Sequence, residues 1–250
     1  MTDDAGQGDA QATLMRLWRR SERPTRGRPS VLDIDSVVAA AVTLADREGV
    51  ANVTLANVAK DLGVTKMSLY RHIGSKAELL ELMADVAIGD PPALDPGSDW
   101  RSGLTTLAAA NREVLMSHPW LVELPLSGPP AGPHAVAWMD AFLRTLRDTG
   151  LDWNTKGGIL VLIGGYVRLA CAQAIQLAEG RKDSGLSQAQ AEQSYGKGLA
   201  ELIDPERFPD AAGFLTAGLG AAPPDQADDP DFAFGLDVVL NGIATLVDAS

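Results

Sequence analysis

Hydrophobic side chains recur every three or four residues along most of the chain, which is the period of an amphipathic helix. Glycine, proline and aspartate interrupt this pattern at intervals and divide it into separate segments. No segment sustains the strict alternation that is typical of a half-buried strand. The sequence therefore predicts an all-α protein, with helices at about 33–48, 55–62, 66–73, 76–88, 100–117, 134–149, 154–179, 187–203 and 232–247, and single turns near 120–124 and 211–215.

The segment 54–82 has the layout of a helix-turn-helix. Thr54 and Thr65 can each cap a short helix, and Gly63 can adopt the left-handed backbone that ends the first of them. The apolar positions of both helices fall on one side and leave donors and aromatic rings on the other. A short helix with such a surface fits the major groove of DNA, which is about 12 Å wide. The pattern therefore indicates a DNA-binding element.

The helix that follows begins with Ser75 and Glu78, which have the S-x-x-E spacing of a capping box. Lys76 lies in its first turn, where a positive charge opposes the helix dipole. A DNA phosphate at this helix start would remove the conflict, because helix N-termini and lysine side chains both bind phosphate. We therefore expect Lys76 to contact the DNA backbone.

The distribution of charge supports this interpretation. The chain has 250 residues, of which 46% are hydrophobic, enough for a sizeable core in one large or two ordinary domains. Its net charge is −12. Residues 16–76 nevertheless hold eleven Lys and Arg against six Asp and Glu, whereas residues 77–250 hold ten against twenty-four. The positive segment contains the helix-turn-helix, so it is the expected DNA-facing part, and its affinity should fall as salt rises.

We expect three parts: a flexible basic extension at 1–30, a helix-turn-helix domain at 31–75 and a helical domain at 76–250. Glycines and prolines at 89–97 break the chain after the helix at 76–88. In the extension, Arg26 and Arg28 could follow phosphates or enter the minor groove, as homeodomain arms do. The alternative is a solvated arm, or a short helix that lays apolar side chains on the protein body. Those side chains are Leu14, Leu17 and Trp18.

Few residues suggest a catalytic or metal-binding site. Cys171 is the only cysteine, which excludes an intrachain disulfide and fits a reducing cytoplasm. His118 and His134 lack a helical i, i+4 spacing, no carboxylate completes a metal cluster with them, and no nucleophile–base pattern stands out. The longest apolar run, 157–167, is shorter than the roughly 20 residues that span a bilayer. We therefore expect no metal, cofactor, enzyme activity or membrane segment.

In combination these features resemble the TetR family of bacterial transcriptional regulators. The likeness rests on the AxxxG helix end at 45–49, on TLANVAKDLGV at 54–64, and on LYRH at 69–72 with the helix start that follows. Ile73 departs from the family, in which many relatives carry phenylalanine, but an apolar side chain is kept. A likeness to the branch that includes the tetracycline repressors lies in HPWLVELP at 118–125 and FAFGLDVVLNGI at 232–243.

The resemblance implies a homodimer that places two helix-turn-helix domains on half-sites of double-stranded operator DNA. By match to the family's recognition helix, Lys66 and Ser68 are expected near base edges, and Met67 could touch a thymine methyl group. The alternative is an ordinary solvated helix face. The full set of expected DNA-contacting residues is Arg26, Arg28, Thr54, Thr65, Lys66, Met67, Ser68, Tyr70, Arg71, His72 and Lys76.

The resemblance also implies a small-molecule effector bound in each C-terminal domain, which shifts the DNA-binding domains through the helix at 76–88 and weakens operator binding. Such pockets are mostly apolar with a few convergent polar groups, here Asn111, His118 and Tyr166. The alternative for each aromatic side chain is an ordinary core position, and for His118 a role at a helix end. The expected lining is Met83, Val86, Leu107, Asn111, Met116, His118, Trp138, Met139, Phe142, Leu162, Tyr166 and Cys171.

Glycines interrupt the two apolar helices at 154–179 and 232–247. A glycine inside a helix costs about 1 kcal/mol relative to alanine, which the close approach of another helix can offset. We therefore expect these helices to form a four-helix dimer interface, two from each subunit. Core packing within one subunit is the alternative. The glycines are Gly157, Gly158, Gly164, Gly165, Gly235 and Gly242.

Three functions are compatible with the sequence. The first is a ligand-responsive dimeric repressor that acts in the cytoplasm. The second is a regulator of the same fold that responds to a protein partner or to no ligand. The third is a small-molecule enzyme that retains a vestigial helix-turn-helix. Specific DNA binding separates the first two from the third, and release of that DNA by a ligand separates the first from the second.

Overall fold

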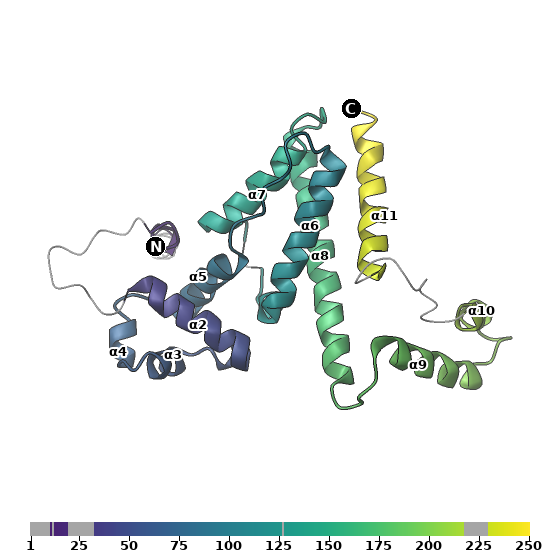
Figure 1. Ribbon diagram of the computed structural model, residues 1–250, viewed down its shortest axis with the longest axis horizontal. Coiled ribbons are helices and arrows are strands. Elements are labelled where there is room, and N and C mark those ends of the chain that lie inside the picture. The colour runs from purple at the N-terminus through teal and green to yellow at the C-terminus, as the bar shows by residue number, and fades with distance from the viewer. Residues whose placement is uncertain (1–10, 12, 20–32, 127, 218–229) are drawn as a thin grey trace, which may run out of the picture.

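The computed structural model describes residues 11, 13–19, 33–126, 128–217 and 230–250. Every regular element in these residues is a helix, which confirms the predicted all-α fold (Figure 1). The helices are α2 Ile34–Glu48, α3 Leu55–Asp61, α4 Lys66–Leu69, α5 Lys76–Ile88, α6 Trp100–Ser117, α7 Pro133–Thr145, α8 Trp153–Arg181, α9 Gln188–Leu202, α10 Pro209–Ala217 and α11 Pro230–Val247, with short 3-10 helices η1 Val50–Asn52 and η2 Pro119–Glu123.

Two helices are shorter than the sequence pattern predicted. After Leu69 the backbone tightens, and the N–H groups of His72 and Ile73 both donate to the Leu69 carbonyl, at 2.8 and 2.9 Å. This ends α4 after one turn instead of two. The end of α7 tightens similarly, because the Leu146 N–H donates to the carbonyl three residues before it at 3.2 Å. The helix therefore ends at Thr145 and not near residue 149.

Helices α2, α3 and α4 form a small unit whose apolar side chains join the main core. Asp33 caps α2 by accepting a hydrogen bond from the Ser36 N–H at 2.7 Å. Gly49 ends the helix with a φ of 82°, a conformation that is strained for other residues. Apolar side chains from the three helices and the turn after α4 are fully buried together. They include Val38, Leu44, Val58, Leu69 and Ile73.

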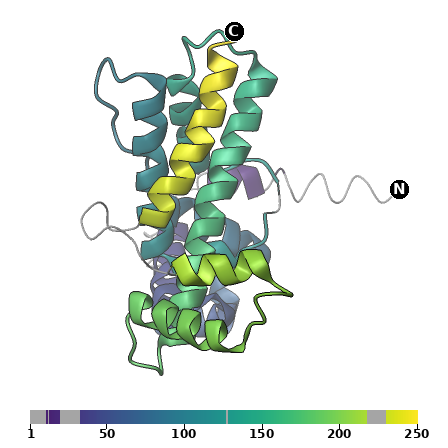
Figure 2. The ribbon, with the colours of Figure 1, turned by 90° about the vertical axis from the view of Figure 1, so that its right-hand side faces the viewer.

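Helix α5 joins this unit to the larger C-terminal part. It packs against α2 and also contacts α7 and α6 (Figure 1). Leu79, Leu82 and Met83 on α5 are almost completely buried. Beyond α5, helix α8 packs against both α6 and α11 (Figures 1 and 2). A change in the position of α5 would therefore alter its contacts with both α2 and the C-terminal helices, so we call this region the joint.

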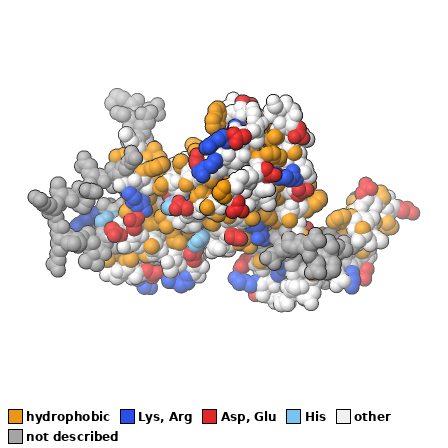
Figure 3. All heavy atoms as spheres, turned by 45° about the horizontal axis from the view of Figure 1, so that its top comes forward, with side chains coloured by type: hydrophobic (Ala, Val, Ile, Leu, Met, Phe, Trp, Pro, Cys, Tyr) orange, Lys and Arg blue, Asp and Glu red, His pale blue; other side chains and the backbone are white. Residues whose placement is uncertain are grey.

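Helices α8 and α11 remain unusually exposed for apolar helices. By length and composition alone each could cross a membrane, which the short run at 157–167 did not predict. Only 22% of the most apolar window of each helix is buried. Hydrophobic side chains also lie open between charged ones on the face shown in Figure 3. Helices α9 and α10 pack on each other and extend away from the C-terminal helices (Figure 1).

Candidate nucleic-acid interface

Buried apolar side chains anchor the inner side of α4, and a threonine caps its first turn. Leu69 and Ile73 are fully buried, as predicted. Thr65 caps the helix, because its hydroxyl accepts a hydrogen bond from the Ser68 N–H at 3.3 Å. The hydroxyl oxygens of Thr65 and Ser68 are 2.9 Å apart and share a second hydrogen bond. The helix is thus fixed on its inner side, and its outer side is open to a partner.

The outer side of α4 carries cationic and aromatic side chains. Met67 is 71% exposed and Tyr70 is 47% exposed. Lys66 and Arg71 are exposed as well. The Lys66 ammonium lies 5.7 Å from the centroid of the Tyr70 ring, a cation–π contact that holds both groups at the surface. This combination of positive charge and flat rings suits contacts to phosphates and base edges.

Thr54 and His72 are only half-buried and take part in the fold. Thr54 caps α3 by accepting a hydrogen bond from the Asn57 N–H at 3.1 Å. The hydrogen bond from Ser36 lowers the pKa of Asp33, and the nearby His72 lowers it further. His72 therefore interacts electrostatically with Asp33, which caps α2. DNA contacts by Thr54 and His72 stay predictions.

The predicted capping box at the start of α5 forms only in part. Ser75 accepts a hydrogen bond from the Glu78 N–H at 3.1 Å, as expected. The Glu78 carboxylate, however, accepts from the Gly74 N–H at 2.8 Å and contacts the Arg16 guanidinium, instead of reaching the Ser75 N–H. The second half of the prediction is wrong because a cation distant in sequence draws this carboxylate away. Lys76 lies exposed in the first turn of α5.

The predicted DNA-contacting residues within 54–76 thus fall at the start of α3, on and just after α4, and at the start of α5. Arg26 and Arg28 lie outside the described residues, so the proposed contact of the arm with DNA stays a prediction.

The residues predicted to line an effector pocket are spread over several environments. Leu107 and Trp138 are buried in one cluster against Phe142, and the rings of Trp138 and Phe142 lie 6.2 Å apart. Met83 and Cys171 are fully buried in the main core. Leu162 and Val86 are exposed at the surface, whereas Asn111, Met116 and Met139 are half-buried.

Two of the predicted polar lining residues bind other parts of the protein. The Nδ1 atom of His118 lies 2.8 Å from the Asp46 carboxylate on α2, which also accepts a hydrogen bond from the Trp120 indole at 2.6 Å. The Tyr166 hydroxyl donates to the Phe232 carbonyl at 2.6 Å. The His118 side chain thus meets a carboxylate on another helix and does not cap its own helix end, and an effector contact by either residue stays a prediction.

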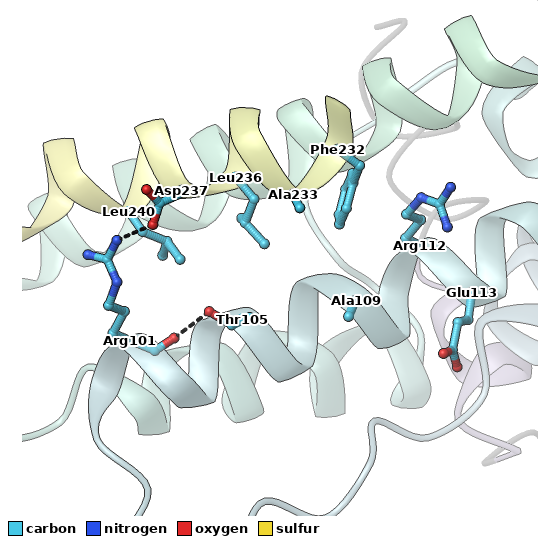
Figure 4. A pocket seen from close by; sticks show the side chains of 10 residues that line it. All are labelled: Arg101, Thr105, Ala109, Arg112, Glu113, Phe232, Ala233, Leu236, Asp237 and Leu240. Atoms are coloured by element: carbon cyan, nitrogen blue, oxygen red, sulfur yellow. Dashed lines mark hydrogen bonds and ion pairs between the residues drawn. The ribbon is translucent and has the colours of Figure 1, made fainter. Parts of the chain in front are cut away.

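A cavity of about 330 Å³ lies between α6 and α11 (Figure 4). Phe232, Leu236 and Leu240 line it from α11, and Thr105 and Ala109 from α6. The remaining lining residues are Arg101, Arg112, Glu113, Ala233 and Asp237.

An arginine lies near each end of the cavity. Near one end the Arg101 guanidinium pairs with Asp237 at 2.5 Å. Near the other the Arg112 guanidinium lies 5.2 Å from the centroid of the Phe232 ring. A second cavity of about 460 Å³ lies beside the start of α6 and is more polar. None of the predicted pocket residues lines either cavity.

Comparison with protein families identifies both halves of the chain. Residues 37–83 match the model of bacterial regulatory proteins of the tetR family, and residues 91–247 match the tetracyclin repressor-like C-terminal domain. The chain belongs to the TetR family. It is 33% identical over 249 residues to the HTH-type transcriptional repressor DrrR1 of Streptomyces coeruleorubidus, which covers 98% of this chain and 90% of that protein.

Solved structures share this fold, among them one of the TetR-family protein ActR. The Streptomyces coelicolor protein ActR in complex with actinorhodin superposes with a TM-score of 0.69 at 22% identity, covering 87% of this chain and 99% of ActR. BioQ with its double-stranded DNA operator superposes with a TM-score of 0.54 at 23% identity, covering 76% of this chain and 99% of BioQ.

In this TetR-family chain the contacts that join the DNA-binding unit to the C-terminal part were not foreseen from the sequence. The carboxylate of Asp85 on α5 accepts a hydrogen bond from the Ala135 N–H at the start of α7, at 3.0 Å. A side chain at Gly132 would overlap this carboxylate, so the glycine makes room for it. No cluster of three or more metal-binding side chains occurs in the part of the chain that the structure describes.

Proposed function

We propose that the protein is a dimeric transcriptional repressor that binds a palindromic operator in the cytoplasm and leaves it when a small molecule binds. The observation that carries the proposal is the short helix α4, whose buried side is anchored by Leu69 and whose open side presents Lys66, Met67 and Tyr70. Membership of the TetR family and the repressor relative DrrR1 support this function.

For DNA binding we infer different roles for the residues on α4 and for those that follow it. Lys66, Met67 and Ser68 lie on α4 itself, where side chains can reach base edges in the major groove. Tyr70 just after α4 and Lys76 at the start of α5 are placed to contact phosphates, which fix orientation without reading sequence. BioQ, which shares the fold, was solved with its operator.

A dimer through α8 and α11 accounts for the exposed apolar faces of both helices. Val161 and Leu169 on α8 and Phe234 and Val238 on α11 are each more than half exposed. Water is a poor environment for so large an apolar area, and a second copy of the chain would cover it.

The glycines of these helices support the same interface. An added Cβ at 157, 158, 164, 165 or 242 would meet nothing within 4 Å inside the subunit. Packing within one subunit therefore does not explain these glycines, although it does explain Gly235, where a Cβ would overlap the Tyr166 ring. The close approach of partner helices would give the others a physical reason.

For the effector we propose the cavity between α6 and α11. Its volume of about 330 Å³ lies within the range of small-molecule sites, and its lining is mostly apolar. A cavity of this size favours a ligand-responsive repressor over a regulator that responds only to a protein partner. ActR, solved with actinorhodin, shows that a protein of this fold can bind a small molecule.

The test has two steps. Gel-shift assays at low salt with the DNA upstream of the protein's own coding sequence should show a discrete complex, and no complex would contradict the proposal. The complex is then titrated with a small-molecule library that includes actinorhodin. At least one compound should release the DNA, and Ala109→Trp, which fills the cavity, should abolish release without weakening DNA binding. Release that persists in this variant would place the effector elsewhere.

A further inference from the structure

A short N-terminal segment lies across the joint between the DNA-binding unit and the C-terminal part. Residues 13–17 are helical, and Leu17 is buried with the main core at 4% exposure. The turn after this helix ends at Arg19, which takes a φ of 51°, a conformation that is unusual for a residue other than glycine. The Arg19 guanidinium donates back to the Arg16 carbonyl at 2.9 Å, which closes the turn.

Two arginines attach this segment to the joining helix α5 and to α2 of the DNA-binding unit. The Arg16 guanidinium pairs with Glu78, whose carboxylate is nearly buried at the start of α5. The Arg19 guanidinium pairs with Asp35 in the first turn of α2 at 2.6 Å. The first pair is the stronger tie, because a buried carboxylate that loses its cation is costly, whereas the exposed Arg19 pair contributes little by itself.

Trp18 attaches the same segment to the C-terminal part. The Trp18 indole N–H donates to the Ala131 carbonyl at 2.9 Å. Ala131 precedes Gly132, which packs against the Asp85 carboxylate that caps α7. Residues 16–19 therefore contact the starts of α2 and α5 and the loop before α7 at the same time.

We propose that residues 13–19 form a strap that holds the DNA-binding unit at a fixed angle on the C-terminal part, in the arrangement that binds the operator. The proposal rests on the repressor function proposed above. A dimer must present its two recognition helices at a fixed spacing. A DNA-binding unit that is already oriented before it meets DNA loses less conformational freedom on binding. The strap acts by position alone and does not need to touch DNA.

This role makes a specific prediction about discrimination between DNA sequences. Binding to an operator with two half-sites depends on the orientation of both DNA-binding units. Non-specific binding depends on phosphate contacts, which a DNA-binding unit in another orientation can still make. Breaking the strap should therefore lower affinity for the operator and leave affinity for unrelated duplex DNA unchanged. A segment that merely stabilised the fold would lower both affinities through loss of active protein.

The test uses the full chain with Arg16→Met and Trp18→Phe combined, which removes the charge and the indole donor but keeps apolar bulk. The matched control is Met15→Ala on the same segment, where Met15 is 42% exposed. Thermal unfolding checks that each variant is folded, and Trp18→Phe alone serves if the double variant unfolds. Operator and unrelated duplex are titrated in parallel.

The strap predicts an operator affinity at least about fivefold below that of the control, which is the lower end of typical coupling between sites. It predicts no change on unrelated DNA. Operator affinity equal to the control, higher than the control, or lowered together with non-specific affinity would overturn the proposal. If the unmodified protein shows no preference for any operator, the repressor function fails instead, so the two failures are distinguishable.

Discussion

The proposed dimer can be tested at one aromatic side chain. Phe234 on α11 is 74% exposed. An aromatic side chain offers about 200 Å² of surface, so this exposure leaves about 150 Å² for a partner, worth about 4 kcal/mol at roughly 25 cal/mol per Å². Because the dimer is two-fold symmetric, the substitution removes this free energy at two positions. The net loss in dimer affinity is smaller than the sum, because ordering the side chains and associating the subunits cost free energy. We therefore expect Phe234→Ala to raise the dissociation constant of the dimer by at least about 100-fold, or about 2.7 kcal/mol.

Phe214→Ala is a matched control. Phe214 is 64% exposed but lies on α10, outside the two helices of the proposed interface. Sedimentation velocity over a range of protein concentrations measures both dissociation constants, and circular dichroism confirms that the helices are retained. The control should leave the dimer unchanged. Equal effects of the two substitutions, or an unmodified protein that stays monomeric at micromolar concentration, would refute the proposed interface.

The other predictions concern DNA contacts, the α5–α7 joint and pH. Lys76→Ala should lower the slope of log affinity against log salt by about 0.9, because one phosphate contact is lost, and an unchanged slope would exclude that contact. Tyr70→Ala should weaken operator binding in gel shifts while fold and dimer stay intact; binding as tight as the parent's would show the assignment to be wrong. Asp85→Ala should lower the free energy of unfolding by about 1–3 kcal/mol in denaturant titrations, because the Ala135 N–H loses a buried acceptor, and a loss below about 0.5 kcal/mol would contradict this. Hydrogen bonding lowers the pKa of Asp33 in the folded state, so its contribution to stability should be complete above about pH 4 and lost as pH falls through the lowered pKa. Asp33→Asn should remove this part of the acid sensitivity in pH-dependent thermal unfolding, and a variant with the acid sensitivity of the parent would exclude the effect.

The sequence predicted those features that are set within one or two helical turns. Thr54 and Thr65 cap their helices as expected, and Leu69 and Ile73 are buried where the apolar spacing placed them. Each of these outcomes depends on neighbours a few residues away, which a single sequence displays directly.

Contacts between distant segments could not be predicted in this way. His118 meets Asp46 across 72 positions, and Glu78 turns toward Arg16 across 62. Which aromatic side chains fill the core and which border a cavity likewise depends on how helices pack in space. Leu107 and Trp138 fill a packed cluster, while the cavity forms beside the small side chains of Thr105 and Ala109.

The most direct test of the account is selection of bound sequences from a pool of random double-stranded DNA by the full-length protein. A dimer with two exposed recognition helices predicts that the enriched sequences are inverted repeats whose half-site centres lie about one helical turn, roughly 10 base pairs, or slightly more apart. Substituting Lys66 and Ser68 with alanine should alter the enriched bases within each half-site. Enrichment of no sequence, or of single sites without symmetry, would contradict the central claim.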